Sequence, residues 1–344
     1  MFRLPVPHLI RATLTQEENR VATLEIRERL ERLGFALGNV LKYNQNRGRV
    51  VLSCGPNEDC IAKIYLQGIY APFRHLNRPE NEIRAHMELA TSTVSPIIPR
   101  GIASDHSAVV MERILGVSLP EYIVENSDSA IDICGKVIDQ YIQSSRELGA
   151  VLGHIDVYSL ASAEVNELWR VAFQSDAPMS RILAHRFATP LKINRDCLKA
   201  IVKLSVSAQS NASSLFPVFA CRDLYVHNIL VAGTYPKVVD WDNAGATFLE
   251  FEISLFVASV VGLFLQVGLM HEASKFISVI ATKIRQAEEI NFEVYINALS
   301  VYLAAMQINP TLWNTDLNPS LTYSFIQRYG IVRRLRVIRE TVEQ

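Results

Sequence analysis

The sequence has little net charge and few cysteines. Its 344 residues include 34 basic and 35 acidic side chains, which gives a formal net charge of −1. Without a basic excess, the composition does not indicate a nucleic-acid-binding surface, and we expect no nucleic-acid partner. The five cysteines are odd in number, and no two have the Cys-x-x-Cys spacing. The sequence therefore indicates free thiols in a reducing compartment, not a disulfide framework or a zinc site.

Targeting signals and long apolar runs are also scarce. The amino-terminal segment lacks an apolar run followed by the small residues of a cleavage site. We therefore expect no secretion and predict a cytoplasmic location. One uncharged stretch, Ile253 to Met270, lies at the lower end of the length that a membrane-spanning helix needs. It contains Gln266, and no basic cluster flanks it closely, so we expect a buried core helix and no membrane partner.

The remaining composition is typical of a folded protein with a sizeable core. Apolar residues make up 49% of the chain and charged residues 20%. At about 150 residues per domain, the length predicts roughly two domains or lobes. Thr15 and Glu18 form a capping-box pattern ahead of a helical stretch. Three strand-like runs follow, at residues 39–43, 49–54 and 60–66, and the turn-rich pieces between them predict an antiparallel meander.

Further along the chain, the predicted elements change from strands to helices. Residues 79–90 read as a helix, 108–114 as a strand and 131–154 as a long amphipathic helix. A short β-rich island then precedes a helical carboxyl-terminal region. We therefore predict the α+β class, with the lobe boundary near residues 115–118. The predicted parts are a helical segment at 1–36, a small antiparallel-sheet lobe at 37–116 and a larger, mostly helical lobe at 117–344.

The β-rich island contains the residues with the clearest chemical meaning. Asp223 and Asn228 lie in the run CRDLYVHNILV, and Asp240 follows in VVDWD after a second apolar run. Phosphoryl transfer needs such groups, because one carboxylate must orient or deprotonate the acceptor hydroxyl. An amide and a second carboxylate must hold Mg²⁺ against the phosphates. A lone Asp and Asn at this spacing is a weak signal, since both are common turn residues, but Asp240 between apolar runs strengthens it.

These motifs resemble those of the aminoglycoside phosphotransferase and choline kinase family. The Asp-Leu-x-x-x-Asn-Ile-Leu spacing from Asp223 and the Asp-Trp-Asp at 240–242 carry the resemblance. Protein kinases would have Asp-Phe-Gly and a later Ala-Pro-Glu, which are missing here. Cys221 stands where the family usually has His. The resemblance implies a bilobal protein-kinase-like fold.

The amino-terminal half adds to this resemblance. Lys63, in CIAKIY, resembles the strand lysine that contacts the α- and β-phosphates, and Glu82 on the following helix resembles its carboxylate partner. Glu80 and Glu88 on the same helix are rivals for that role. Arg328 to Arg339 forms a basic carboxyl-terminal stretch, read as a solvated helix face with an anionic-substrate site as the alternative.

The same resemblance implies a set of nucleotide-binding residues. The segment AVVMERILG resembles the hinge that receives the purine, which places Met111, Glu112 and Ile114 at the base. No Gly-x-Gly-x-x-Gly lies between the first strands. The loop NQNRG takes its place, and Asn46 and Arg47 in that loop are expected at the phosphates. The cofactors implied are ATP, or GTP, and Mg²⁺.

The function implied is a kinase that transfers the γ-phosphate to a hydroxyl of a small molecule, such as an amino sugar, an antibiotic or an amine-bearing alcohol. Asp223 and Lys63 would be catalytic, Asn228 and Asp240 would hold Mg²⁺, and Asp242 would be a second metal contact or a structural carboxylate. Two alternatives remain open: a protein Ser/Thr kinase and an inactive nucleotide-binding scaffold. The sequence does not identify the acceptor; a set of acidic residues would attract a cationic one. These residues are Glu121, Glu125, Asp128, Glu250 and Glu252.

Overall fold

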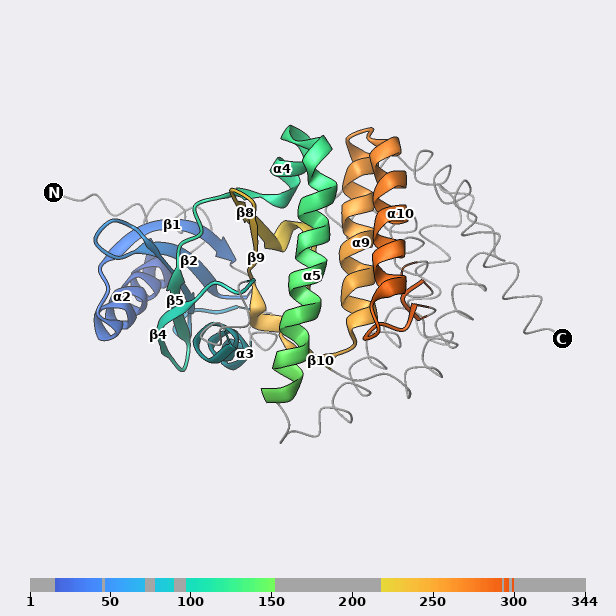
Figure 1. Ribbon diagram of the computed structural model, residues 1–344. Helices are drawn as coiled ribbons and strands as arrows, with labels where there is room; N and C mark the ends of the chain where they lie inside the picture. Colours follow the sequence, from blue (N-terminus) through green and yellow to red (C-terminus); the bar gives the residue numbers. More distant parts are fainter. Residues whose placement is uncertain are drawn as a thin grey trace, which may run out of the picture. The chain divides into compact units, whose positions relative to one another are not determined.

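A computed structural model of the chain divides into two compact units (Figure 1). Unit 1 comprises Met1–Val117 and Leu230–Ala244, and unit 2 comprises Ser118–Ile229 and Gly245–Gln344. The antiparallel sheet of unit 1 and the helices of unit 2 confirm the predicted α+β class. The residues that the structure describes are 16–44, 47–71, 78–89, 97–151, 218–292, 294–296 and 299.

Unit 1 is built on a five-stranded antiparallel sheet with the strand order β1-β2-β3-β5-β4. The meander predicted from the sequence forms its first three strands. The strand β4 was not predicted, because the prolines ahead of it read as loop punctuation. It forms a tight hairpin with β5, in which Asp105 pairs with Ala108. The strands are β1 (Leu37–Asn44), β2 (Arg49–Cys54), β3 (Cys60–Tyr65), β4 (Gly101–Asp105) and β5 (Ala108–Glu112).

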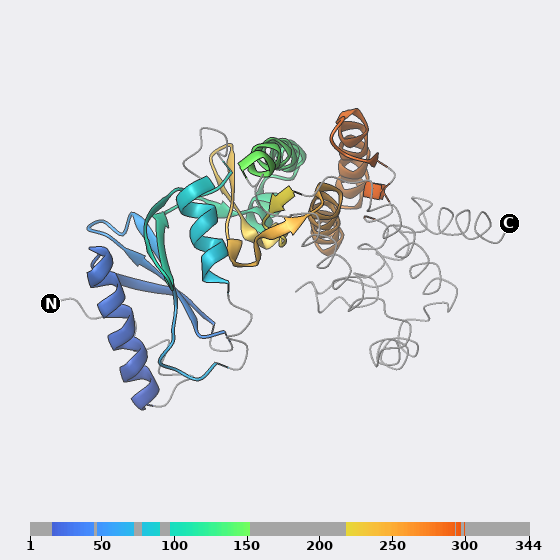
Figure 2. The same cartoon turned by 90° about the horizontal axis from the view of Figure 1, so that it is seen from below.

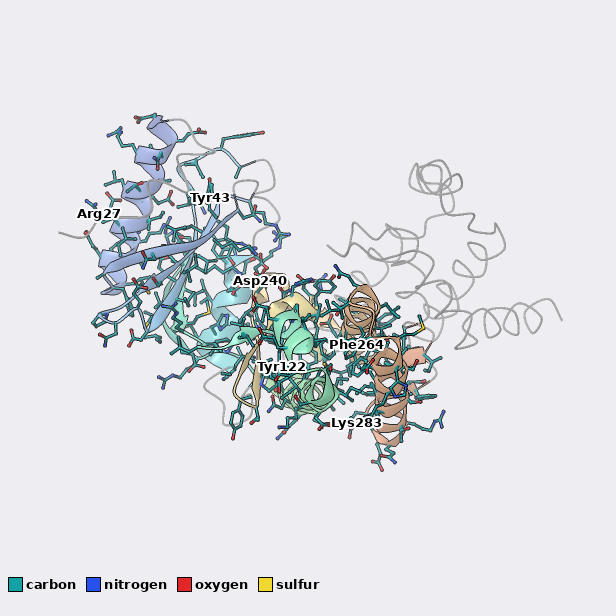
Figure 3. The ribbon with its side chains drawn as sticks, turned by 90° about the horizontal axis from the view of Figure 1, so that it is seen from above. Arg27, Tyr43, Tyr122, Asp240, Phe264 and Lys283 are labelled. Carbon is teal, nitrogen blue, oxygen red and sulfur yellow. The ribbon has the colours of Figure 1, made fainter. Side chains whose placement is uncertain are left out.

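The helix α2 (Gln16–Leu33) covers one face of this sheet. Its residues Ala22, Ile26 and Leu30 lie in the same buried cluster as alternate residues of β2 and β3, including Ile64. Arg27 lies on the exposed side of the helix (Figure 3). Because successive strand residues point to opposite faces, Lys63 points away from α2. Thr15, the predicted cap of this helix, lies outside the described residues.

A second helical segment, α3 (Pro79–Arg84), continues directly into a π-helix at Ala85–Leu89. The sequence predicted one regular helix over 79–90, and helical periodicity alone does not show where the hydrogen bonding widens. Pro79 occupies the first turn, where its missing N–H costs no hydrogen bond. Glu82 is buried on this helix, whereas Glu80 is exposed. The side chain of Glu88 lies outside the described residues.

The segment Leu230–Ala244 groups with the amino-terminal part of the chain, whereas the predicted boundaries assign everything after residue 116 to the second lobe. Its strand β9 (Tyr235–Val238) donates a hydrogen bond from Val238 N–H to the carbonyl of Ile97 at 2.7 Å. The strand belongs to a three-stranded sheet of order β6-β8-β9, with β6 at Val117–Ser118 and β8 at Ile229–Ala232. A 3₁₀ turn, η4 (Trp241–Asn243), follows, and its Trp241 is fully buried. These contacts place the Asp240 motif within unit 1.

The described part of unit 2 is mostly helical. The long helices α5, α9 and α10 run side by side in both Figure 1 and Figure 2. The sequence predicted a long helix from residue 131, but α5 begins earlier, and a separate helix α4 begins with a capping box between Ser118 and Glu121. The helices are α4 (Leu119–Glu125), α5 (Ser127–Val151), α9 (Leu249–Gln266) and α10 (Met270–Gln286), with a strand pair β7 (Val218–Ala220) and β10 (Gly245–Thr247).

Within the described residues, α9 alone is long and apolar enough to cross a membrane, and 89% of that apolar stretch is buried. It packs against α10, with the rings of Phe264 and Phe276 5.9 Å apart. It covers Leu249–Gln266 instead of the predicted 253–270. Gly268 follows it with a positive φ of 81°, a conformation that ends helices and favours glycine. Packing between helices thus accounts for the apolar composition of α9.

Candidate active site

Lys63 on the strand and Glu82 on the helix, which the sequence analysis predicted to be partners, are in contact in unit 1. Lys63 Nζ lies 2.6 Å from Glu82 Oε2, and both side chains are almost completely buried. The strand β3 supplies the lysine from its middle, and α3 supplies the carboxylate. A buried ion pair is costly unless its geometry is good and its remaining hydrogen bonds are made. Its presence therefore indicates a site that holds an ammonium group at a fixed position.

Asp240 approaches the same ammonium group. Its Oδ1 lies 2.5 Å from Lys63 Nζ, so one lysine contacts two carboxylates. The backbone of Asp240 is left-handed, with φ 67°, a region that Asp and Asn tolerate better than most side chains. The buried indole of Trp241 fixes the next residue, because its Nε1–H donates to the carbonyl of Val238 at 2.8 Å. The Asp240 carboxylate is therefore held by both a strained backbone and a buried neighbour.

Burial and charge act in opposite directions on these groups. Desolvation alone would lower the pKa of Lys63, but the carboxylates of Glu82 and Asp240 outweigh it and hold that pKa above its ordinary value. Desolvation would likewise raise the pKa of Asp240, but the ammonium of Lys63 and the guanidinium of Arg49 hold it well below its usual range. Lys63 is therefore a cation and Asp240 an anion at neutral pH. Burial raises the pKa of Asp242 to about 6.

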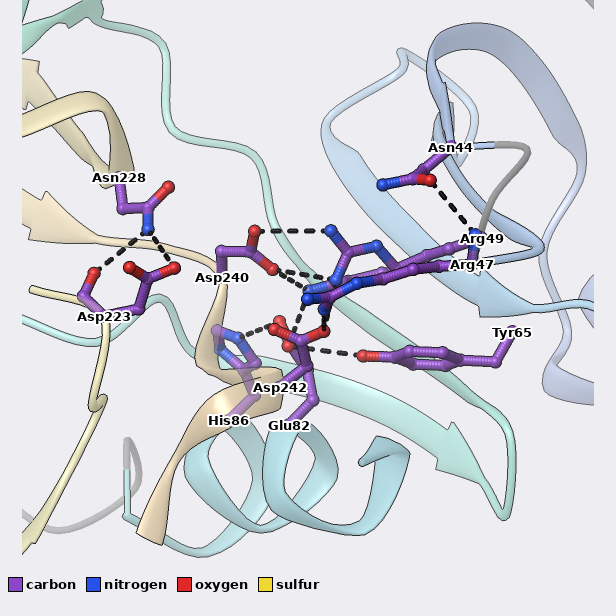
Figure 4. A network of polar contacts seen from close by, with 11 residues as sticks. Asn44, Arg47, Arg49, Tyr65, Glu82, His86, Asp223, Asn228, Asp240 and Asp242 are labelled. Atoms are coloured by element: carbon purple, nitrogen blue, oxygen red, sulfur yellow. Dashed lines mark hydrogen bonds and ion pairs between the residues drawn. The ribbon is translucent and has the colours of Figure 1, made fainter. Parts of the chain in front are cut away.

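Two arginines from the first hairpin contact the aspartates (Figure 4). Arg47 Nη1 lies 3.0 Å from Asp242 Oδ2. Arg49 Nη1 lies 3.2 Å from Asp240 Oδ1 and also contacts Asp242. The sequence singled out Arg47 for the phosphates but did not single out Arg49. Asn46, also predicted there, lies outside the described residues.

Two further residues, which the sequence did not single out, orient Glu82. The Tyr65 hydroxyl donates to Glu82 Oε2 at 3.4 Å, and His86 Nε2 lies 3.2 Å from Glu82 Oε1. The other ring nitrogen of His86 lies 2.7 Å from the carbonyl of Pro99. Both oxygens of Glu82 are therefore engaged. The spacing of His86 four residues after Glu82 on one helix was the available sequence signal.

The three carboxylates of unit 1 provide a donor set that fits a divalent cation. Glu82, Asp240 and Asp242 each offer one oxygen, and these oxygens all lie within 4.8 Å of one another. Carboxylate oxygens are the ligands that Mg²⁺ prefers in proteins. The same three carboxylates already contact Lys63, Arg47 and Arg49. A bound cation would therefore share or replace these partners.

The predicted purine-binding segment lies at the end of β5, where Met111 is buried and pairs with Ile61 of β3. The N–H groups that follow already have acceptors within unit 1. Glu112 N–H donates to the carbonyl of Arg100 at 2.9 Å, and Arg113 N–H donates to the carbonyl of Asp59 at 3.0 Å. The Glu112 side chain accepts from Lys237 at 3.3 Å. A purine would have to use other backbone groups of this segment, such as those of Ile114.

In unit 2, Asp223 and Asn228 lie together on the loop that follows β7 (Figure 4). The Asn228 amide nitrogen donates to Asp223 Oδ2 at 3.1 Å and to the Asp223 carbonyl at 3.0 Å. A 3₁₀ turn, η3 (Val226–Asn228), brings the amide back toward the carboxylate. Arg222, just before Asp223, has a left-handed φ of 60°. Contacts within the loop therefore determine its conformation, and the Asn228 amide fixes the orientation of the Asp223 carboxylate.

The helices beneath this loop hold its backbone. Cys221 N–H donates to the Tyr141 hydroxyl of α5 at 2.9 Å, and that hydroxyl donates to Glu252 Oε2 of α9 at 3.0 Å. Val226 N–H donates to Ser259 Oγ of α9 at 3.1 Å. The sequence did not predict these hydrogen bonds, because the residues that form them lie far apart in the chain and are of types common on helices.

The burial of the acidic residues corrects one expectation. Glu250 and Glu252 are 3% and 4% exposed, so they present no charge to a cationic acceptor at the surface. Glu250 accepts from Asn291 N–H at 2.8 Å, and Glu121 takes part in the α4 capping box. His227 is exposed, with its ring 5.3 Å from that of Tyr225. The Asp128 side chain and Arg328 to Arg339 lie outside the described residues.

We expect Glu252 to make the stability of the protein pH-dependent. Burial raises its pKa to about 7 from an ordinary value of 4.5. The folded chain therefore keeps a proton that the unfolded chain releases between these pH values, so the free energy of unfolding falls as pH rises from about 4.5 to 7. The loss is of the order of 3 kcal/mol, at 1.36 kcal/mol per pKa unit. Urea unfolding followed across pH 4 to 8 measures it.

The variant Glu252→Gln should flatten this slope, because its side chain does not titrate. The exposed Glu125→Gln serves as the control and should keep the wild-type slope. An equally steep fall in the Glu252→Gln chain would show that the proton belongs to another group.

No family model and no curated protein sequence matches this chain. Among solved structures, it is similar to a choline/ethanolamine kinase family protein from Mesorhizobium loti, at 14% identity and a TM-score of 0.48, covering 93% of this chain and 99% of that one. The aminoglycoside phosphotransferase APH(3'')-Id from Streptomyces rimosus matches at 13% identity and a TM-score of 0.46, covering 81% and 97%. A choline kinase from Cryptosporidium parvum matches at 12% identity and a TM-score of 0.47, covering 93% and 97%.

Proposed function

We propose that this protein is a small-molecule kinase that transfers the γ-phosphate of ATP, or GTP, to a hydroxyl group. The observation that carries the proposal is the contact of Lys63 with both Glu82 and Asp240 in the interior of unit 1. Phosphoryl transfer is catalysed mainly by positioning and charge stabilisation, which require a fixed cation and fixed carboxylates. A structural lysine on a strand has no need for two carboxylate partners, one buried and one partly buried, since each desolvated charge is costly.

Unit 1 is the nucleotide-binding part in this proposal. Lys63 binds the phosphates, and Glu82 holds the lysine in place, since both oxygens of Glu82 are engaged. Arg47 assists at the phosphates, as the sequence predicts. Asp240 and Asp242 would hold Mg²⁺, which neutralises charge on the transferred phosphoryl group when it is bound. Asn228, which belongs to unit 2, stays the further metal ligand that the sequence predicts.

Unit 2 supplies the group that acts on the acceptor. Asp223 orients or deprotonates the acceptor hydroxyl, and its carboxylate is already oriented by the Asn228 amide. The hydrogen bonds from the loop to Tyr141 and Ser259 keep that carboxylate at a fixed position without using its oxygens. A general base needs such positioning before its pKa matters.

The test is Mg²⁺-dependent release of ADP by the purified full chain. We expect acceptor-stimulated release with one member of a panel of amino sugars, nucleoside antibiotics, choline-like amines and sugars, and none in EDTA. The Lys63→Met chain, which keeps the side-chain length without the charge, should release no ADP above background. Calorimetry that detects no binding of ATP or GTP to the folded wild-type chain would exclude the proposal. Binding without any hydrolysis would indicate a nucleotide-binding scaffold instead.

A further inference from the structure

Arg49, which the sequence did not single out, has a place at the aspartates that the proposed function does not explain. It engages both oxygens of Asp240, with Nη1 3.2 Å from Oδ1 and Nη2 3.4 Å from Oδ2. Its Nη1 also contacts Asp242 Oδ2 (Figure 4). Arg47 adds a second guanidinium at 3.0 Å from the same Asp242 oxygen.

The register of the sheet explains why Arg49 reaches this place. Arg49 pairs with Tyr65 and Val51 pairs with Lys63 across β2 and β3. Because directly paired residues lie on the same face, Arg49 shares the face of Lys63, opposite the core beneath α2. The Arg49 side chain is only 7% exposed. The first residue of β2 is therefore a fixed, buried cation, unlike a mobile arginine at a loop tip.

The charges in this cluster balance. Three carboxylates, on Glu82, Asp240 and Asp242, contact three cations, on Lys63, Arg47 and Arg49. A guanidinium stays protonated at every accessible pH, so burial cannot neutralise it. A divalent cation held by the three carboxylates would need oxygens of the two aspartates that the arginines contact, and the arginines would repel it. The arginines and a divalent cation therefore compete for one set of ligands.

We propose that Arg49, assisted by Arg47, is a built-in counter-cation of the Asp240–Asp242 pair. It holds both carboxylates while no divalent cation is bound, and it lowers the affinity of the site for that cation. Once displaced, the guanidinium groups are suited to phosphate oxygens, which they bind with paired hydrogen bonds. Metal affinity in the absence of nucleotide is thereby kept low. The phosphate step rests on the proposed function, whereas the competition is a property of unit 1 alone.

The first measurement is titration of the purified full chain with MnCl₂, without nucleotide, followed by the electron paramagnetic resonance signal of free Mn²⁺. Removing a like charge from the ligand site should tighten Mn²⁺ binding by about tenfold or more in Arg49→Gln. Arg47→Gln, which loses one contact to Asp242, should show a smaller gain in the same direction. Arg20→Gln is the matched control, since its partner Glu17 is exposed, and it should bind Mn²⁺ as the wild type does. An Arg49→Gln chain that binds Mn²⁺ no more tightly than the wild type would overturn the proposal.

The second measurement is ATP binding at saturating MgCl₂, where the bound cation has displaced Arg49 from the aspartates. Here Arg49→Gln should weaken binding, by about tenfold for a lost pair of charge-assisted hydrogen bonds. The two effects thus have opposite signs, whereas a purely structural role for Arg49 would weaken both ligands, and that result would overturn the proposal. If the wild type binds no ATP, the proposed function fails, but tighter Mn²⁺ binding by Arg49→Gln would still support the competition.

Thermal unfolding shows whether the Arg49→Gln variant is folded. Arg49→Gln should unfold at a lower temperature than the wild type in EDTA, because the buried carboxylate of Asp242 and the partly buried one of Asp240 lose a partner. MnCl₂ should raise its unfolding temperature more than that of the wild type, since a ligand that binds the folded chain more tightly stabilises it more. An equal or smaller rise would overturn the proposal. If Arg49→Gln does not fold, Arg47→Gln decides: tighter Mn²⁺ binding supports the proposal, and unchanged affinity overturns it.

Discussion

The Asp223→Asn chain should lose phosphoryl transfer while it keeps its affinity for nucleotide. The amide removes the proton acceptor, and loss of a positioned general base costs about 10²- to 10⁴-fold in rate. The substitution is nearly isosteric and leaves an oxygen that can accept from the Asn228 amide. The loop should therefore keep its shape. Acceptor-dependent ADP release measures the rate, and calorimetry with ATP measures the affinity.

A carboxylate elsewhere in unit 2 provides the control for this experiment. Asp139 on α5 is exposed and pairs with Lys283 of α10, so Asp139→Asn should leave both rate and affinity unchanged. Asp223→Ala should resemble Asp223→Asn in rate. If nucleotide binding disappears together with activity in the Asn variant, Asp223 has a structural role and not the one assigned to it.

The second large effect is expected at Asp240. Asp240→Asn should remove Mg²⁺-dependent turnover, by about a hundredfold or more, because a metal ion supplies several kcal/mol of charge stabilisation and 1.36 kcal/mol corresponds to a factor of ten. Asn tolerates the left-handed backbone that φ 67° imposes, so the backbone should be retained. Steady-state rates across a range of MgCl₂ concentrations measure the effect.

Loss of the Asp240 charge also removes one partner of Lys63 and of Arg49. Thermal unfolding of the variant must therefore accompany the rates, so that the fraction of folded chain is known. Glu17→Gln, at an exposed ion pair on α2, is the matched change of a carboxylate to an amide and should have the wild-type rate. A folded Asp240→Asn chain with an undiminished Mg²⁺-dependent rate would refute the metal assignment.

The sequence was sufficient for those parts of unit 1 whose signals are local. The alternation of apolar residues in RVVLSC and CIAKIY, with turns between them, predicted β2 and β3 closely. Lys63 could be matched with Glu82 because one stands mid-strand and the other on the next helix. The choice of Glu82 over Glu80 was made by family resemblance, and in the structure Glu82 is the buried one.

The parts that sequence reasoning missed depend on register and on distant contacts. Arg49 contacts Asp240 and Asp242 only because the pairing of β2 with β3 sets which face it shares, and a one-residue shift would turn it to the other face. Tyr141 and Glu252 meet beneath the Asp223 loop from two helices that are far apart in the chain. Residue type and spacing within one segment contain no information about such pairs.

Unit 1 consists of two segments that are far apart in the chain, so its folding depends on the order in which they are synthesised. Arg49 and Lys63 are translated early, but their carboxylate partner Asp240 is 191 residues beyond Arg49 and 177 beyond Lys63. During synthesis on the ribosome, most of the polypeptide must therefore be made before Arg49 and Lys63 can contact Asp240. Closing so long a loop is slow relative to forming the local hairpins. The charged face of the sheet is consequently completed late, after the apolar face beneath α2 can already have formed.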